Sequence, residues 1–409
     1  MKKFRITFFG GPSAEYADRP EIISDMKDSG IDLAQVWYPT VEKNRSVVRA
    51  LGNQGIEATV FDPRIRGLYD SNAGSDEVDS VVKMIVDDYK DLDNIIGWEL
   101  ADEPSKSNFP VLARLVSAFK KYSPECETTI NLFPNYATPE QTGSTDYKTH
   151  LEEFIDTVKP SYISYDHYSF MGREGRKKAE ISCGAEENER ERLIRLSAET
   201  TEDRGGFFQN IEDVRSAAIK HSLDSMLIVL LTEHGPYRNL TREEIRCEVN
   251  MCLAYGMKRL SYFTYWRPSD CDEFWQWDNA MCDVDGSKTR HYYDVKQINS
   301  DIRAAGEYLF GRKSAAVFHI GGNEKGTKEF SSYGGINEIK SDRHIVIGFF
   351  DDGSAYLVNG DYINDADVTI ATDGREFTFT GREGIISSDG GSVHIAAGDA
   401  VLLVPSDRR

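Results

Sequence analysis

The chain has 409 residues, of which 48 are Lys or Arg and 68 are Asp or Glu, so its formal net charge at pH 7 is −20. A surface of this sign opposes binding to nucleic acid and to anionic membranes, because both attract clustered basic residues. No stretch approaches the ~18 apolar residues of a transmembrane helix, and the six cysteines form no CxxC pair that would indicate a zinc module.

Short β-branched or aromatic runs alternate with amphipathic helical stretches over the first ~310 residues. Eight strands are predicted, at 5–9, 33–37, 57–61, 95–101, 128–132, 162–165, 227–231 and 259–265. Helices are predicted at 20–29, 41–51, 76–92, 109–122, 147–158, 211–222, 242–255 and 292–310, and a glycine that can end a helix in the left-handed conformation follows four of them, at Gly30, Gly55, Gly256 and Gly311. This β-α alternation predicts an α/β fold, a (β/α)8 TIM barrel over residues 1–311.

The remaining residues, 312–409, have no helical period. Short strands are predicted at 315–320, 345–350, 355–359, 367–372, 376–380, 392–396 and 400–404, separated by glycine-containing turns, which indicates a small all-β sandwich domain. Between the sixth strand and the sixth helix lies a long charged segment, 171–204. It is either a solvated helix with i,i+4 ion pairs or a lid or partner-binding arm, since βα loops surround the active-site face of a barrel.

Two glutamates stand where the predicted fourth and seventh strands end. Glu103 lies in the segment GWELADEP, residues 97–104, and Glu233 in LIVLLTEHG, residues 227–235. Each follows apolar residues that would bury it unless it faced the open end of the barrel, and an unpaired buried carboxylate is costly. Strands four and seven face each other across a barrel, so we expect the two side chains to converge in one cleft.

Two converging carboxyl groups suit the cleavage of a glycosidic bond. Asp102 lies beside Glu103, and its charge favours a raised pKa of Glu103 and hence the role of general acid for Glu103. Glu233, between Thr232 and His234, is the better nucleophile. A separation of about 5–5.5 Å would indicate retention of the anomeric configuration, and one of ~6.5–9.5 Å would indicate inversion.

These motifs resemble those of the (β/α)8 retaining glycoside hydrolases of clan A, which carry the acid/base after strand four and the nucleophile after strand seven. The segment YISYDHY, residues 162–168, is similar to the sixth strand of that group, and YFTYW, residues 262–266, is similar to its eighth. DGSKT at 285–289, leading into YDVKQIN at 293–299, looks like the last barrel helix of β-galactosidase-like members. The resemblance covers most of the chain and implies that Glu103 is the acid/base and Glu233 the nucleophile.

One position departs from the clan. Its members usually have Asn before the acid/base Glu, where the amide contacts the sugar 2-hydroxyl, but this chain has Asp102. An ionised Asp accepts hydrogen bonds but cannot donate them, and its charge should raise the pKa of Glu103 further. We expect the catalytic machinery to survive this change, whereas assignment of the substrate by analogy becomes less safe.

Polar residues near the same strand ends are candidates for substrate binding. Tyr168 is expected to donate a hydrogen bond to the nucleophile, which keeps that carboxylate ionised, or else to be a packing tyrosine. Asp166 and His167 would bind sugar hydroxyls or form a structural pair that fixes their loop. His234, next to the predicted nucleophile, belongs to the same candidate set.

Aromatic residues near the ends of strands two and eight complete this set. Trp37 and Trp266 each present an indole face that can stack on a pyranose, although aromatic residues there also cap barrel cores. Glu99 is in phase with Glu103 but four residues deeper, where an unpaired charge is costly. We therefore expect Glu99 to pair with a cation such as Arg5 and to be structural.

The sequence thus predicts a retaining glycoside hydrolase that cleaves a β-galactoside or β-glucoside by double displacement, with carbohydrate as its substrate and no cofactor. Two alternatives stay open: a non-catalytic glycan-binding barrel, and a metal-dependent sugar isomerase or lyase with Glu103, Asp166, His167, Glu233 and His234 as ligands. The oligomeric state is not predicted. The start of the chain favours the cytoplasm, whereas a leader removed earlier would mean export, in which case Cys271 and Cys282 could bridge.

Overall fold

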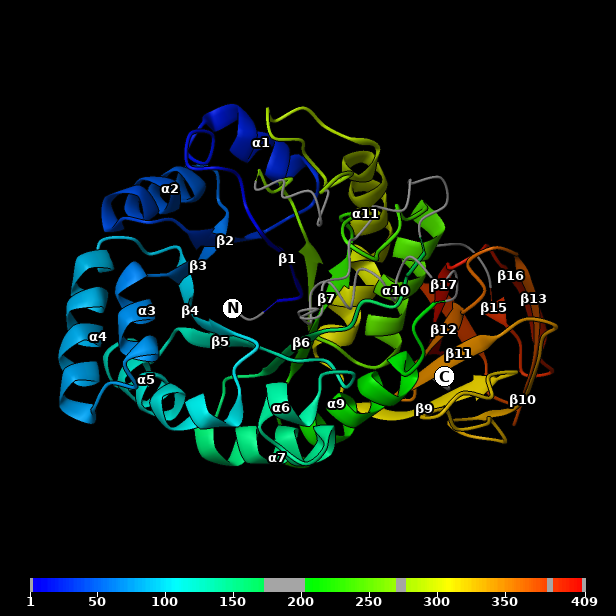
Figure 1. Ribbon diagram of the computed structural model, residues 1–409. Helices are drawn as coiled ribbons and strands as arrows, with labels where there is room; N and C mark the ends of the chain where they lie inside the picture. The colour runs from blue at the N-terminus through cyan, green and yellow to red at the C-terminus, as the bar shows by residue number, and fades with distance from the viewer. Residues whose placement is uncertain (1–2, 173–202, 270–276, 381–384, 407–409) are drawn as a thin grey trace, which may run out of the picture.

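A computed structural model describes residues 3–172, 203–269, 277–380 and 385–406 of the protein (Figure 1). Eight parallel strands form one sheet in the order β1-β8-β7-β6-β5-β4-β3-β2, and β1 pairs with β8, so the sheet curls into a nearly closed barrel. This confirms the predicted TIM barrel. The strands are β1 Arg5–Phe9, β2 Leu33–Trp37, β3 Glu57–Phe61, β4 Ile95–Asp102, β5 Glu127–Leu132, β6 Ile163–Asp166, β7 Ser225–Leu230 and β8 Arg259–Phe263.

Helices surround the barrel (Figure 1). They are α1 Pro20–Asp28, α2 Val41–Asn53, α3 Pro63–Asp70, α4 Ser75–Tyr89, α5 Phe109–Tyr122, α6 Pro139–Thr142, α7 Tyr147–Val158, α9 Phe207–His221, α10 Arg242–Ala254 and α11 Arg290–Phe310, with the 3-10 turn η1 Lys106–Asn108. Helix α3 was not predicted, although Asp62 caps it by accepting a hydrogen bond from the Arg64 amide. The left-handed ending predicted at Gly311 is wrong, because its φ is −82°.

Two ion pairs fill the end of the barrel at which the strands begin. The Arg5 guanidinium donates to both carboxylate oxygens of Glu57, at 2.9 and 3.3 Å, and Arg259 donates to both oxygens of Glu127, at 2.7 and 3.1 Å. Bidentate geometry of this kind compensates for burying the two arginines. The partner predicted for Glu99 is therefore wrong, because Arg5 is committed to Glu57.

Two antiparallel sheets follow α11 and confirm the predicted all-β module. Their strand orders are β15-β14-β17-β12-β11-β9 and β10-β13-β16, and residues such as Ile347, Leu357 and Val368 form the core between them. Strands β10 and β15 were not predicted. The strands are β9 Ser314–Ile320, β10 Ile336–Lys340, β11 Ile345–Phe350, β12 Ala355–Asn359, β13 Ala366–Thr372, β14 Phe377–Thr380, β15 Ile385–Ile386, β16 Gly391–Ile395 and β17 Ala400–Pro405.

Helix α10 joins the barrel to this module (Figure 1). The Asn250 side chain donates to the carbonyl oxygen of Gly398 at 2.9 Å and accepts from the Tyr356 hydroxyl at 2.7 Å. Gly348 of β11 lies so close to α10 that a Cβ placed there would be 1.8 Å from the carbonyl oxygen of Ala254. The barrel and the sandwich therefore share a tight, hydrogen-bonded seam.

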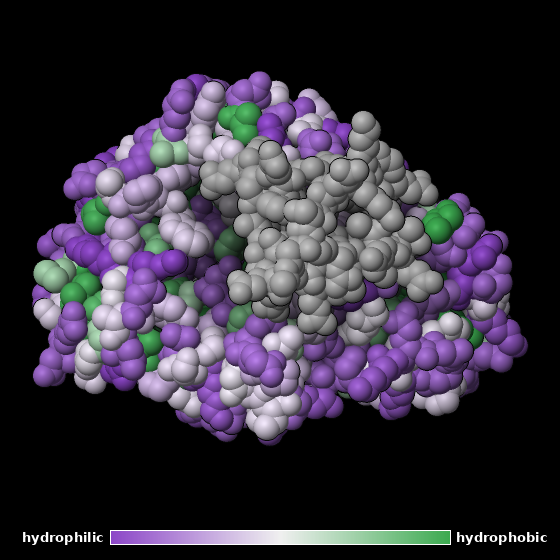
Figure 2. All heavy atoms as spheres, in the orientation of Figure 1, coloured by the Kyte–Doolittle hydropathy of each residue, from purple (hydrophilic) through white to green (hydrophobic). Residues whose placement is uncertain are grey.

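Hydrophilic side chains cover most of the face shown in Figure 2, as expected for a chain with a net charge of −20. Within the described ranges, no helix is long and apolar enough to cross a membrane. Most of the charged segment 171–204 and Cys271 lie outside the described residues. Cys282 is buried and its thiol is free.

Candidate active site

The end of β4 turns two consecutive acidic residues toward one chamber. The pairing of β4 with β5 shifts register between Glu99 and Ala101, which places Asp102 opposite Asn131. Glu103 then adopts a φ of 46°, and its amide donates to the carbonyl oxygen of Asn131 at 2.8 Å. Non-glycine residues rarely occupy this left-handed region, and such conformations cluster at functional sites.

This chamber, called the catalytic chamber below because it holds the predicted acid Glu103, has a volume of about 160 Å³ and opens at the carboxyl ends of the strands. The rings of Phe9 and Phe263 lie 5.8 Å apart, and Tyr168 packs on Phe263 at 5.6 Å, so part of the wall is aromatic. The other walls carry carboxyl and amide groups. A sugar has the same two kinds of surface, apolar C–H faces and polar hydroxyl edges. The lining residues are Phe9, Asp102, Glu103, Asn131, Asp166, Tyr168, Ile228 and Phe263.

One amide group holds two of these acids. Nδ2 of Asn131 donates to Oδ1 of Asp102 at 3.0 Å and to Oδ1 of Asp166 at 2.9 Å. The Ser164 hydroxyl donates to Oδ1 of Asn131 at 3.0 Å, which fixes the orientation of the amide. Sequence reasoning missed Asn131, although a polar residue near the carboxyl end of a predicted barrel strand is a signal that could have identified it.

The surroundings of the chamber raise the pKa of its carboxyl groups. Burial, followed by the charges of Asp166 and Asp102, raises the pKa of Glu103 to about 9. Burial and the charge of Asp102 likewise raise the pKa of Asp166. Asp102 is exposed on one side, yet its surroundings still raise its pKa by removing water from the rest of the group. Glu103 is therefore protonated at neutral pH, the state that a general acid needs.

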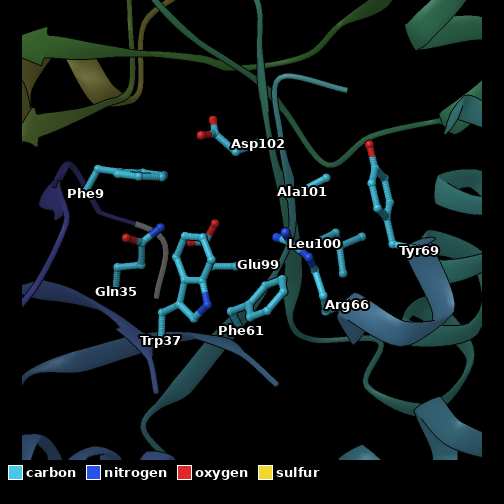
Figure 3. Close-up of a pocket in the computed structure, with 10 residues that line it drawn as sticks. All are labelled: Phe9, Gln35, Trp37, Phe61, Arg66, Tyr69, Glu99, Leu100, Ala101 and Asp102. Carbon is cyan, nitrogen blue, oxygen red and sulfur yellow. The ribbon is translucent and has the colours of Figure 1, made fainter. Parts of the chain in front are cut away.

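A second chamber, of about 90 Å³, adjoins the first and shares Phe9 and Asp102 with it (Figure 3). Figure 3 shows the Glu99 side chain behind the Trp37 ring and close to the Gln35 amide. Burial raises the pKa of Glu99 to about 7, although hydrogen bonds with Thr59 and Gln35 oppose the rise. Glu99 thus reaches a cavity and is not paired with a cation at the barrel floor.

The two predicted stacking tryptophans lie in different surroundings. Trp37 is 46% exposed at the rim of the second chamber, where its ring packs on Phe61 at 4.9 Å. Trp266 is only 4% exposed and packs on Tyr16 at 5.2 Å, outside the lining of both chambers. Trp37 therefore has a face available to a ligand, whereas Trp266 caps the packed core.

Glu233 lies just beyond β7, held by the loop that precedes α11. Its side chain accepts from Nδ2 of Asn279 at 2.7 Å, and its carbonyl oxygen accepts from the Asp278 amide at 2.9 Å. His234 donates from Nδ1 to the carbonyl oxygen of Thr232 at 2.7 Å and stacks on Trp277, with ring centroids 4.4 Å apart. These contacts fix both predicted residues near the carboxyl end of the barrel.

The neighbours His167 and Tyr168 have different environments. His167 is fully buried, its Nδ1 lies 3.0 Å from Oδ1 of Asn210, and burial lowers its pKa to about 4, so it is a neutral core residue. Tyr168 lines the catalytic chamber, and its ring contacts Tyr237 at 5.4 Å. The hydrogen bond from Tyr168 to Glu233 stays a prediction.

The five residues that the isomerase or lyase alternative would use as metal ligands lie in three different parts of the barrel. Asp166 and Glu103 line the chamber, His167 lies in the core, and Glu233 and His234 follow β7. Within the described ranges, no three His, Cys, Asp or Glu side chains are grouped as metal ligands would be. The donor arrangement thus gives the isomerase or lyase alternative no support.

No protein family model and no curated protein sequence matches the chain. Among solved structures, it is similar to a glycoside hydrolase family 5 protein from Bacteroides vulgatus ATCC 8482, with a TM-score of 0.58 and 12% identity over 99% of this chain and 89% of the other. The chain therefore shares the (β/α)8 barrel fold of this structure.

Two β-galactosidases share this fold with it. One, from the psychrophilic Marinomonas ef1, has a TM-score of 0.50 and 11% identity over 76% of this chain. The other, from Rahnella sp. R3, has a TM-score of 0.53 and 12% identity over 77% of this chain. The chain spans 62% and 58% of their respective lengths, so part of each β-galactosidase is left unmatched.

Proposed function

We propose that the protein is a retaining glycoside hydrolase that cleaves a β-linked glycoside of the galactoside or glucoside type. The observation that carries this proposal is Glu103, a carboxylic acid whose pKa is raised by burial and by the charges of Asp166 and Asp102, in a chamber with an aromatic wall. The fold shared with glycoside hydrolases supports the same reaction class. The second acid would be Glu233, which follows the opposite strand, β7.

The proposed reaction has two displacements. In the first, Glu103 gives its proton to the glycosidic oxygen while the Glu233 carboxylate attacks the anomeric carbon, forming a glycosyl ester and releasing the alcohol. In the second, ionised Glu103 takes a proton from water, whose oxygen displaces Glu233 from the same carbon. Each carboxyl group returns to its starting state, and the anomeric configuration is retained.

The remaining polar groups would orient the sugar. Asp102 and Asp166 can accept hydrogen bonds from its hydroxyls, because the Asn131 amide fixes one oxygen of each and leaves the other available. Trp37 would stack on a second sugar unit at the rim. Binding groups held this firmly keep a substrate in a reactive orientation.

Hydrolysis of 4-nitrophenyl β-glycosides by the wild type, Glu103→Gln and Glu233→Gln tests the proposal. We expect each variant to lose about 10²-fold or more in kcat, with thermal unfolding unchanged, and the wild type to release the β-anomer first, as seen by proton NMR. Wild-type rates in both variants would refute the catalytic assignment. Loss in Asp166→Asn but not in Glu233→Gln would transfer the second role to Asp166.

A further inference from the structure

Near the catalytic chamber lies a guanidinium group that has no carboxylate partner among the described residues. The Arg204 guanidinium carbon sits 3.8 Å above the centre of the Tyr136 ring, and Nη1 donates to the Tyr237 hydroxyl at 3.4 Å. Within the part of the chain that the structure describes, no Asp or Glu forms an ion pair with Arg204, although its neighbour Asp203 pairs with Arg238. Most of its five N–H donors are therefore free for a ligand or water.

The position of Arg204 is fixed by its backbone and by the preceding residue. Its amide donates to the carbonyl oxygen of Ser169 at 2.8 Å. Asp203 accepts from the Arg238 guanidinium at 3.2 Å and from the Tyr362 hydroxyl of the sandwich at 2.7 Å. With its backbone held in this way, and its guanidinium held by Tyr136 and Tyr237, Arg204 loses little conformational freedom when it binds a planar anion.

Two tyrosines connect Arg204 to the catalytic chamber. Tyr237, which accepts from Arg204, packs against the ring of Tyr168, and Tyr168 lines the chamber together with Glu103. The Tyr136 hydroxyl, beneath the guanidinium, accepts from the Tyr168 amide at 3.5 Å. The charge of Arg204 also acts on Asp166, although the two groups form no ion pair. Arg204 is thus next to the wall that a bound sugar would touch.

We propose that Arg204 binds an anionic substituent of the substrate, a carboxylate or a sulfate ester on the sugar in the catalytic chamber. The substrate would then be an acidic β-glycoside, an inference that rests on the proposed glycosidase function. The fork of N–H groups matches the paired oxygens of such anions. The neighbouring carboxyls of Asp102 and Asp166 disfavour an anion deeper in the chamber, so the substituent would point outward to Arg204.

The test compares 4-nitrophenyl β-glycosides of the gluco and galacto series that differ only at C6, as the hydroxymethyl, carboxylate or 6-O-sulfate form. We expect the wild type to cleave one anionic form with a kcat/KM at least about tenfold above the neutral form. Arg204→Gln should lower kcat/KM for the anionic form about tenfold or more, while changing kcat/KM for the neutral form less than about threefold. For the anionic form, Arg204→Lys should have a kcat/KM between those of the wild type and Arg204→Gln, because lysine keeps the charge but lacks the paired N–H donors.

Arg49→Gln is the matched control. It removes one positive charge from the exposed surface of α2, where Arg49 pairs with Asp91 at 3.1 Å, and should leave the anionic-to-neutral ratio unchanged. Thermal unfolding of each variant checks folding. An equal loss of kcat/KM for all three C6 forms in Arg204→Gln would show that Arg204 acts only through Asp166. A wild type that cleaves the neutral form faster than both anionic forms would also overturn the proposal.

Binding separates this inference from the proposed function. Titration of Glu103→Gln with glucuronate and galacturonate, followed by calorimetry, should show affinity that the added Arg204→Gln change removes. If no glycoside is hydrolysed but this binding is found, the glycosidase proposal fails and the anion site stands. If neither acid binds in an Arg204-dependent way, the anion site is refuted whatever the hydrolysis shows.

Discussion

The protonation of Glu103 depends on two other acids held by the Asn131 amide. As the proposed general acid, Glu103 would act only while protonated, so we expect activity to fall as pH rises through its pKa, which burial, Asp166 and Asp102 raise to about 9. Asp166→Asn removes one of these like charges and should lower that pKa, moving the alkaline limb of kcat/KM to lower pH by up to ~1 unit. A pH–rate profile of wild type and variant measures the shift.

Ser164→Ala provides the matched control for this shift. It removes the hydroxyl that orients Asn131 but leaves the charge of Asp166 in place. Its alkaline limb should stay near that of the wild type, even if its rate falls. An alkaline limb of Asp166→Asn at the wild-type position or above it would contradict the proposed charge effect.

Truncation of Trp37 should weaken substrate binding, whereas truncation of Trp266 should lower stability. Trp37 is 46% exposed at a chamber rim, so Trp37→Ala should raise KM roughly three- to tenfold and leave the melting temperature nearly unchanged. Trp266 is buried against Tyr16, so Trp266→Ala should cost about 3–5 kcal/mol of stability by leaving a cavity. Steady-state kinetics and thermal unfolding of both variants measure these effects. An unchanged KM in Trp37→Ala would remove Trp37 from the binding site.

At the scale of elements, the seam between α10 and β11 joins the barrel to the sandwich. A Cβ at Gly348 would meet the carbonyl oxygen of Ala254 at 1.8 Å, so Gly348→Ala must push the two elements apart. We expect a loss of at least about 1–3 kcal/mol in the free energy of unfolding, measured with denaturant. Gly67→Ala is the control, because its Cβ would meet nothing within 4 Å in α3. Equal stability of both variants would show that the seam is not tightly packed.

The sequence predicted the barrel well because periodicity reports which face of an element is buried. The ranges of β1, β2 and β3 were predicted to the residue, and α5 and α7 likewise. Helix α3 was not predicted because it is short. The sequence indicates only where this helix begins, since Asp62 caps it and Pro63 is its first residue. Periodicity is a weak guide for an element of two turns.

The site was predicted only in part, because its geometry departs from regular strands. In a regular strand every second side chain faces the same side, so an inward-facing Glu99 predicts a single inward-facing acid, Glu103, at the end of β4. The register shift in β4 and the left-handed backbone of Glu103 instead bring both Asp102 and Glu103 to the chamber. The Asn131 bridge depends on contacts across three strands, which no local pattern encodes. The burial of His167 likewise follows from its packing on Asn210, at the start of a distant helix.

At the scale of the whole molecule, most of the acidic surface is solvated, and a few carboxyls are gathered where the strands end. The net charge of −20 therefore describes the surface, whereas the proposed chemistry depends on the buried acids around Glu103, whose pKa is raised. The sandwich contributes through its seam with α10 and through the Tyr362 hydroxyl, which donates to Asp203, the residue before Arg204. In the proposed reaction, these parts serve one step, the donation of a proton from Glu103 to a glycosidic oxygen.

The leaving-group dependence of Glu103→Gln tests that step most directly. An aryl β-glycoside with an acidic phenol needs little protonation of its leaving oxygen, whereas an alkyl glycoside needs it fully. With Glu103 as the acid, pre-steady-state release of 2,4-dinitrophenol by the variant should stay near the wild-type rate, while methyl glycoside cleavage falls about 10²–10⁴-fold. An equal fall for both substrates, or none for either, would contradict the assignment of Glu103 as the general acid.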